Sequence, residues 1–237
     1  MYNTVLGAKP LHLDGRTFYY SDYNFKGHKV YSDTQHWACC SGTLPQVAAD
    51  YRINTYFHDP QGVWVNLFIP STVKWRRDGS EIILTQSGEY PFDTTVQFDV
   101  TTSKPREFSI HFRIPAWAAG ASISINGRRM PNSVMEGSFM TLRREWANND
   151  RIELDLPMTT RLEPVDPRQP QTVALLFGPL VLFPLTEKRV TLPHADLLGA
   201  NRMDKRSWQV KTNSSTIRLL PFIQINDEQY STYVEVT

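Results

Sequence analysis

The sequence predicts a mainly β protein in which an antiparallel β-sandwich region follows a short helical segment. From Asn54 onward, short runs of alternating apolar and polar residues succeed one another, which is typical of half-buried strands. Turn-forming pairs such as Asp78-Gly79 and Asn126-Gly127 separate many of these runs. With 237 residues, the chain is long enough for one large β domain or two smaller ones. A succession of short strands of this kind favours a sandwich.

The first 50 residues differ from the rest of the chain. The segment "MYNTVLGA" is a short apolar fragment, and "GRTFYYSDYNFKG" is aromatic and irregular. We expect neither segment to close a hydrophobic core alone.

A helix is predicted next, before the chain turns into strand. Gly42, Thr43 and Pro45 indicate its start, with Thr43 or Ser41 as the N-cap and Pro45 in the first turn. Apolar residues at helical spacing follow at Leu44, Val47, Ala48 and Tyr51.

Alternation and turn signals predict the strands that follow. The segments "TYFHDPQGVWVNLFIPS" and "VKWRRDGSEIILTQ" each contain two strands around a turn. In "FSIHFRIPAW" the apolar residues fall on one face, and Ser109, His111 and Arg113 fall on the other. The residues assigned to the core on this basis are Phe108, Ile110, Phe112, Ile114, Ile123, Ile125, Ile152, Leu154 and Leu156.

The last third of the chain contains a segment that is apolar throughout. "VALLFGPLVLF" is typical of a central strand covered on both faces, and we expect Gly178-Pro179 to bend it. "LPHADLLGANRMDKRSWQVK" has the weakest pattern and is predicted to be a surface excursion. "TIRLLPFIQINDEQYSTYVEV" is predicted to hold two final strands around Asn226-Asp227.

Composition excludes several classes of function. Twenty-five Lys and Arg against 24 Asp and Glu leave a formal charge of +1, which argues against a nucleic-acid binder and against an anionic membrane surface. Two cysteines are too few for a disulfide scaffold. The chain has no long apolar stretch and no signal peptide, so as written it is expected in the cytoplasm, although a longer parent protein could be exported.

The two cysteines are adjacent, at Cys39 and Cys40 in "HWACCSGTLPQ". A disulfide between them is disfavoured, because neighbouring Cα atoms lie about 3.8 Å apart and disulfides prefer roughly 4.4–6.8 Å. One interpretation is two small buried side chains. The other is a pair of thiolates near the positive end of a helix, suited to nucleophilic attack or to zinc. With His36, the pair would give a tetrahedral zinc site at most three ligands.

Other candidate residues carry weaker signals. Five tryptophans could form a sugar-stacking platform, although a place in the core is favoured for each of Trp64, Trp75, Trp117, Trp146 and Trp208. His58, His111 and His194 are isolated in the sequence. Phosphate-binding glycine loops, a nucleophile elbow and the HExxH motif are absent from the sequence.

The motifs, taken in order, resemble the C-terminal part of the bacterial β-L-arabinofuranosidase family, glycoside hydrolase family 127. They are "MYNTVLGA", "DGRTFYY", "WACCSGTLPQVAADY", "VWVNLFIPS", "FRIPAW", "SINGRRM", "LRREWANNDRIELDLPM" and "GPLVL". The cysteine pair followed by a helix and by "VNLFIPS" is the most specific combination.

The resemblance implies an (α/α) barrel catalytic domain followed by β-sandwich domains. Residues 1–53 would then be a remnant of the barrel, and residues 54–237 a β-sandwich region of one or two sandwiches. It also implies that Cys39 is the nucleophile of a retaining glycosidase, held as a thiolate by zinc, and that Cys40 is a zinc ligand. In the family, the acid/base glutamate and the other zinc ligands precede the "YN" segment, with which this chain begins. We therefore expect the chain to be truncated, inactive alone and weak in zinc binding.

Two alternatives to the hydrolase interpretation stay open. One is a non-catalytic sandwich that binds carbohydrate or a protein partner and has structural cysteines. The other is a self-sufficient zinc protein that uses His36. If the barrel is missing, the apolar face near Leu6, Leu44 and Val47 is expected to promote self-association.

Overall fold

The computed structural model describes residues 2–4, 7, 14, 16–22, 26–32, 39–131, 134–212 and 215–237. The chain divides into two compact units. Unit 1 combines Met1–Ala49 with Thr159–Thr237, and unit 2 is Asp50–Met158. The predicted division into 1–53 and 54–237 separates a barrel remnant from β domains and not compact units. It stays a prediction.

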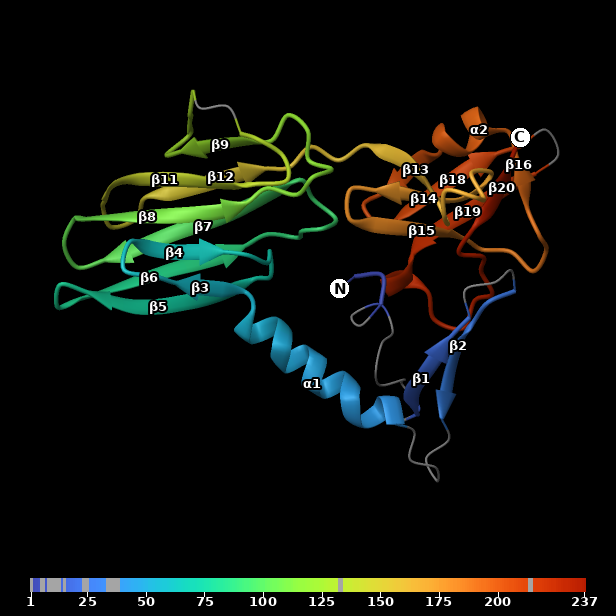
Figure 1. Cartoon of the computed structure of the whole chain (residues 1–237), viewed down its shortest axis with the longest axis horizontal. Helices are drawn as coiled ribbons and strands as arrows, with labels where there is room; N and C mark the ends of the chain where they lie inside the picture. The colour runs from blue at the N-terminus through green and yellow to red at the C-terminus, as the bar shows by residue number, and fades with distance from the viewer. Residues whose placement is uncertain are drawn as a thin grey trace. The chain divides into compact units, whose positions relative to one another are not determined.

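Unit 2 is built from strands that form two sheets (Figure 1). The six-stranded sheet has the order β10-β9-β12-β7-β6-β5, and the four-stranded sheet has the order β11-β8-β4-β3. Their strands are β3 (Tyr56–His58), β4 (Gly62–Val65), β5 (Ser71–Arg77), β6 (Ser80–Ser87), β7 (Thr95–Thr102), β8 (Arg106–Arg113), β9 (Ser122–Ile125), β10 (Arg128–Arg129), β11 (Phe139–Trp146) and β12 (Arg151–Asp155). Within unit 2, all described pairings are antiparallel except the parallel pair β4 and β8.

The two sheets of unit 2 enclose one hydrophobic core, which confirms the predicted β-sandwich architecture. Phe98 of β7 and Phe112 of β8 meet across it with ring centroids 4.9 Å apart. Trp75 of β5 contacts the Phe108 ring edge-on at 5.4 Å. Each large side chain buried in this way contributes about 1.5–3 kcal/mol. The core residues predicted in segments 108–114, 123–125 and 152–156 are all buried.

The hairpin turns of unit 2 also agree with the sequence. Asp78 and Gly79 have φ of 47° and 75°, and Asn126 and Gly127 have φ of 50° and 78°. Positive φ at both central residues is the signature of a type I′ turn, whose twist suits antiparallel strands.

Unit 1 contains one large sheet and a separate hairpin. The large sheet has the order β16-β20-β14-β15-β19-β18-β17, with β13 paired to β14. The elements are β1 (Thr17–Ser21), β2 (Lys29–Ser32), β13 (Thr160–Pro164), β14 (Thr172–Phe177), β15 (Leu180–Pro184), β16 (Thr191–Leu192), α2 (His194–Leu198), β17 (Asn201–Asp204), β18 (Ser207–Lys211), β19 (Thr216–Pro221), the 3₁₀ helix η1 (Phe222–Gln224) and β20 (Val234–Val236). The predicted bend at Gly178-Pro179 is the turn between β14 and β15.

Two predictions in unit 1 were wrong. The segment 192–211 is not a surface excursion, because α2, β17 and β18 form there, β17 and β18 join the sheet, and Trp208 and Val210 are buried. Within the segment 15–27, residues Thr17–Ser21 are not irregular, since they form β1, which pairs antiparallel with β2. In both cases short strands that are neighbours in the chain pair with each other although their local pattern is weak.

The helix α1 spans Cys39–Ile53, so it begins before the predicted start at residues 41–45. Pro45 therefore lies inside the helix and not in its first turn. Since proline has no N–H, the Ser41 carbonyl loses its usual α-helical donor. The helix nevertheless continues on both sides of Pro45. Among the described residues, no helix is both long and apolar enough to cross a membrane.

Candidate functional site

The two cysteines are the first two residues of α1. The first four N–H groups of an α-helix have no partner within the helix, and they form the positive end of its dipole. A thiol in such a place ionises more readily than a free thiol. The side chains of Cys39 and Cys40, like all of His36, lie outside the described residues, so the roles predicted for them stay predictions.

The other end of α1 is fixed by hydrogen bonds. The Asn54 Nδ2 group donates to the Asp50 carbonyl at 2.7 Å, and the Thr55 hydroxyl donates to the Tyr51 carbonyl at 2.6 Å. The Thr55 carbonyl in turn accepts from the Asn66 backbone N–H at 2.9 Å. These bonds satisfy carbonyls that a helix end leaves free. They join the C-terminal end of α1 to the loop that follows β4.

No group of three His, Cys, Asp or Glu side chains that could hold a metal ion occurs among the described residues. A tetrahedral zinc site takes four ligands, and the cysteine pair can supply two.

A cluster of aromatic and polar side chains covers part of the outer face of the four-stranded sheet. The Trp64 and His111 rings stack with centroids 3.8 Å apart and an interplanar angle of 9°. The Phe139 ring meets Trp64 edge-on at 5.0 Å. The Asp59 carboxylate accepts a hydrogen bond from Trp64 Nε1 at 2.7 Å. His111 Nδ1 lies 2.8 Å from the Thr141 hydroxyl.

Two side chains in this cluster, Asp59 and His111, each have a lowered pKa. The hydrogen bond from Trp64 is the main cause that lowers the pKa of Asp59, and the backbone N–H groups of Gly62 and Gln61 add to it. Burial lowers the pKa of His111, while the nearby charge of Asp59 opposes that shift. The cluster thus favours an ionised Asp59 beside a neutral imidazole. Asp59 is engaged by three donors, which suits a structural carboxylate better than a general base.

Most of the five tryptophans named above have a packing role. Trp146 and Trp208 are fully buried, and Trp75 and Trp117 pack against the core of unit 2. Trp64 is on an outer face, but His111 covers one side of its ring. Four of the five tryptophans therefore pack in or against a core, as the favoured interpretation predicts. His111 is isolated in the sequence but is part of a cluster in the structure.

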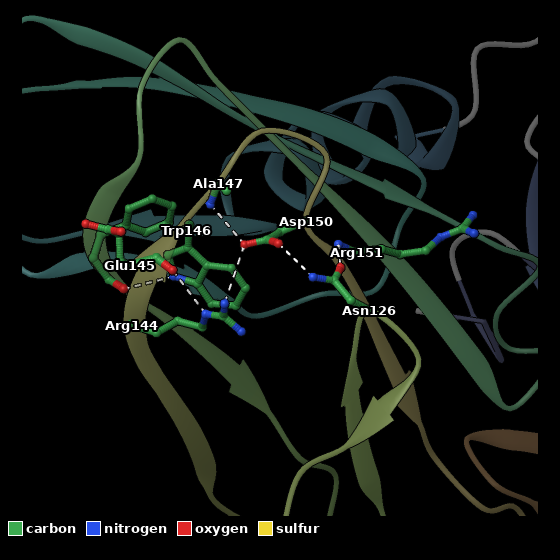
Figure 2. A network of polar contacts seen from close by, with 8 residues as sticks. Asn126, Arg144, Glu145, Trp146, Ala147, Asp150 and Arg151 are labelled. Atoms are coloured by element: carbon green, nitrogen blue, oxygen red, sulfur yellow. Dashed lines mark hydrogen bonds and ion pairs between the residues drawn. The ribbon is translucent and has the colours of Figure 1, made fainter.

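A polar network of unit 2 surrounds Asp150, the residue just before β12 (Figure 2). Its Oδ2 accepts from the Ala147 backbone N–H at 2.9 Å, and its Oδ1 accepts from Asn126 Nδ2 at 2.8 Å. The Asn126 Oδ1 accepts from the Arg151 backbone N–H at 2.8 Å. Arg144 Nη2 lies 3.9 Å from Asp150 Oδ2. The network joins the β9–β10 turn to the β11–β12 turn.

The network around Asp150 is structural in character. Asp150 is 7% exposed, and both its carboxylate oxygens are used by groups of the protein itself. Trp146 is anchored beside it through a bond from Nε1 to the Phe108 carbonyl at 3.0 Å. The sequence patterns considered above do not single out Asp150. The signal that could have indicated it is "NND", where Asn149 adopts a φ of +66° in the tight turn.

Residues 62–158 match the family model described as the middle domain of GH127 β-L-arabinofuranosidase. A search of curated proteins found no match. Three solved structures superpose on the whole chain. The first is described as a glycoside hydrolase, with 20% identity, a TM-score of 0.76, and coverage of 100% of this chain and 47% of that chain.

The other two structures are described as GH127 enzymes, the family named in the matching model. One is a GH127 β-L-arabinofuranosidase from Geobacillus stearothermophilus, with 19% identity and a TM-score of 0.75 over 100% of this chain and 45% of that chain. The next is a GH127 β-arabinofuranosidase, with 18% identity and a TM-score of 0.74 over 100% of this chain and 44% of that chain. The chain thus spans less than half the length of each structure. The family model confirms the resemblance to family 127 over residues 62–158, and the three solved structures share the fold of the chain.

Proposed function

We propose that this chain carries the cysteine-bearing helix and β domains of a retaining glycoside hydrolase that acts on β-L-arabinofuranosides or related sugars. The observation that supports this most is the match of residues 62–158 to the middle domain of family 127. Directly before this domain, α1 begins with the only two cysteines of the chain. Carbohydrate is therefore the proposed ligand class.

In the proposed reaction, Cys39 is the nucleophile. Its thiolate sulfur forms a bond to the anomeric carbon while the bond to the leaving-group oxygen breaks. A carboxylic acid supplies the proton for that oxygen and becomes a carboxylate. This carboxylate then takes a proton from the water that attacks the anomeric carbon, while the carbon–sulfur bond breaks and the sulfur leaves as a thiolate. The family resemblance implies a glutamic acid for this role, and we propose that the chain alone does not turn over substrate.

Activation of Cys39 is proposed to come from its place in α1. The dipole of the helix and the free N–H groups of its first turn favour the thiolate. Zinc, where bound, would hold the sulfur as a thiolate, with Cys39 and Cys40 as the ligands from this chain. Two ligands fill half of a tetrahedral shell, so weak metal binding is expected.

The experiment that tests the nucleophile is alkylation of the native chain with iodoacetamide across a range of pH. We expect Cys39 to react fast, with a pH midpoint below the value of about 8.5 of a free thiol. Cys40→Ser isolates Cys39, and Cys39→Ser isolates Cys40 as the matched control. Two thiols that react only after denaturation would contradict the proposal and support the structural interpretation of the cysteines.

Activity and metal content test the rest of the proposal. An aryl β-L-arabinofuranoside should not be turned over by the chain alone. Measurable turnover that Cys39→Ser abolishes would contradict the expectation that the chain alone is inactive. A tight, stoichiometric zinc site in the purified chain would overturn the expectation of weak binding. Release of that zinc by His36→Ala would instead support a self-sufficient zinc protein.

A second candidate function is a non-catalytic carbohydrate-binding sandwich. It is favoured by Trp64 and by two exposed aromatic side chains of the four-stranded sheet, Phe57 and Phe139. Phe57 pairs with Trp64 across β3 and β4. Titration with arabinose oligosaccharides, followed by tryptophan fluorescence in wild type and in Phe139→Ala, tests this candidate. Saturable binding that the variant loses would support it.

A further inference from the structure

A buried lysine holds together parts of unit 1 that are far apart in the sequence. Lys29 lies on β2 and is 4% exposed. Its Nζ donates to the Phe222 carbonyl at 2.9 Å and to the Ile225 carbonyl at 2.6 Å. It also donates to the Gly7 carbonyl. The ammonium lies 4.3 Å from the centroid of the Phe222 ring.

This arrangement uses all three donors of the ammonium group. Phe222 and Ile225 begin and follow η1, so the lysine bonds carbonyls at that short helix. Gly7 belongs to the N-terminal segment. A buried charge is costly unless it is hydrogen-bonded, and carbonyls that lose a buried donor are costly as well. The Lys29 ammonium therefore links Gly7 of the N-terminal segment to η1 and the residue that follows it.

Two further contacts join residues of the first part of unit 1 to its second part. Asn3 donates from Nδ2 to the Pro179 carbonyl at 2.9 Å and accepts from the Val181 N–H at 2.9 Å. Gly27 and Tyr230 exchange backbone hydrogen bonds of 2.8 and 2.9 Å. A Cβ at Gly7 would lie 2.5 Å from Cδ1 of Phe222, so the segment approaches that ring closely.

We propose that Lys29 is a positioning residue, which ties the segment leading into the cysteine helix to the C-terminal strands. β2 ends at Ser32, and α1 begins at Cys39 on the same stretch of chain. The C-terminal strands, although distant in sequence from the cysteines, thereby help to set where α1 begins. The part of this inference that concerns the reactivity of Cys39 rests on the proposed function; the anchoring itself does not.

The test compares three variants of the full chain with wild type. Lys29→Met removes the ammonium and keeps an unbranched side chain. Lys188→Met makes the same change at an exposed position of unit 1. Val234→Ala creates a small cavity in the core of unit 1, where Val234 is 1% exposed, and controls for general loss of stability. Each protein is studied by hydrogen exchange with mass spectrometry and by the pH profile of iodoacetamide alkylation.

For Lys29→Met, we expect amide exchange to rise at least tenfold in peptides that cover residues 26–32 and 39–49. Peptides from 62–158 should be unchanged. The alkylation midpoint of Cys39 should move toward that of a free thiol. Lys188→Met should match wild type, and Val234→Ala should lower the melting temperature without moving the midpoint. Lys29→Arg keeps the charge and the donors. In both readouts it should therefore lie between wild type and Lys29→Met.

Wild-type exchange and a wild-type alkylation profile in Lys29→Met would overturn the proposal. An equal change of both readouts in Val234→Ala would also overturn it, because the effect would then follow stability alone. Faster exchange in Lys29→Met, combined with a Cys39 thiol that is inert even in wild type, would support the anchoring and contradict the proposed nucleophile. If Lys29→Met does not fold, Lys29→Gln is measured by the same criteria, since its amide keeps two donors.

Discussion

Asp150 shows how one buried carboxylate can join two turns. Its two oxygens accept from Ala147 and Asn126, and the Arg144 guanidinium lies nearby. In Asp150→Asn, one of the two donors would face an amide NH₂ in place of an oxygen. A buried donor without a partner costs about 1–3 kcal/mol.

We predict that Asp150→Asn lowers the free energy of unfolding by roughly 2 kcal/mol, since bonds to charged groups are stronger than neutral ones. Urea denaturation followed by circular dichroism measures this. The control is Glu145→Gln, the same chemical change at an exposed residue of β11, which should stay within about 0.5 kcal/mol of wild type. Equal stabilities of the two variants would show that the network contributes little.

His111 makes the stability of unit 2 depend on pH. Burial lowers the pKa of His111 below its ordinary value of 6.5, so the unfolded state binds the proton more readily than the folded state. The contribution is complete above pH 6.5 and is lost as pH falls from there through the lowered pKa. We predict that the melting temperature falls as pH decreases below 6.5, and that His111→Gln makes this fall shallower. His58→Gln, at an exposed position, is the control and should keep the wild-type slope.

At the scale of elements, the strand β4 depends on a glycine for its parallel pairing with β8. A Cβ at Gly62 would lie 1.8 Å from the Ser109 carbonyl oxygen, which is backbone and cannot move aside. We predict that Gly62→Ala destabilises the chain by roughly 3 kcal/mol, the upper end of what overpacking costs.

Gly79→Ala is the matched control for this prediction. Gly79 has a φ of +75°, and a methyl group at this position would meet nothing within 4 Å, so its cost is backbone strain alone. That strain is about 1–2 kcal/mol. Urea denaturation measures both variants, and a Gly62→Ala protein no less stable than Gly79→Ala would contradict the role assigned to close approach.

The sequence predicted those elements whose pattern is local. Alternation in 108–114 and the turns at Asp78-Gly79 and Asn126-Gly127 each depend on neighbouring residues, and the structure agrees with them. The pairing of β1 with β2 could not be predicted in this way, because the aromatic segment 15–27 shows no clear alternation, and the nearby bridge from Gly27 to Tyr230 joins residues that are distant in the chain. Likewise, Trp64 stacks on His111 only because β4 and β8 pair in parallel with a given register. The sequence indicated that the candidate site lies at the start of α1, but it did not predict that the helix begins at Cys39.

At the scale of the whole molecule, the two units differ in how their chain is arranged. Unit 2 is one continuous stretch, Asp50–Met158, with a core of its own. Unit 1 is made of two stretches, Met1–Ala49 and Thr159–Thr237. A continuous stretch with its own core can fold independently, whereas a discontinuous unit needs both of its parts.

We therefore predict that residues 50–158, produced alone, unfold cooperatively in urea, with the near-ultraviolet circular dichroism expected of a packed Trp146. Residues 159–237 produced alone should lack cooperative unfolding and bind the dye ANS, because Phe222 loses Lys29 and the Gly7 segment that pack on it. Adding a peptide of residues 1–49 in excess should reduce the ANS signal, since that segment supplies the missing contacts. A cooperatively folded 159–237 fragment that ignores the peptide would mean that the C-terminal strands need no N-terminal segment. In that case the C-terminal strands would hold the N-terminal segment in place without needing it to fold.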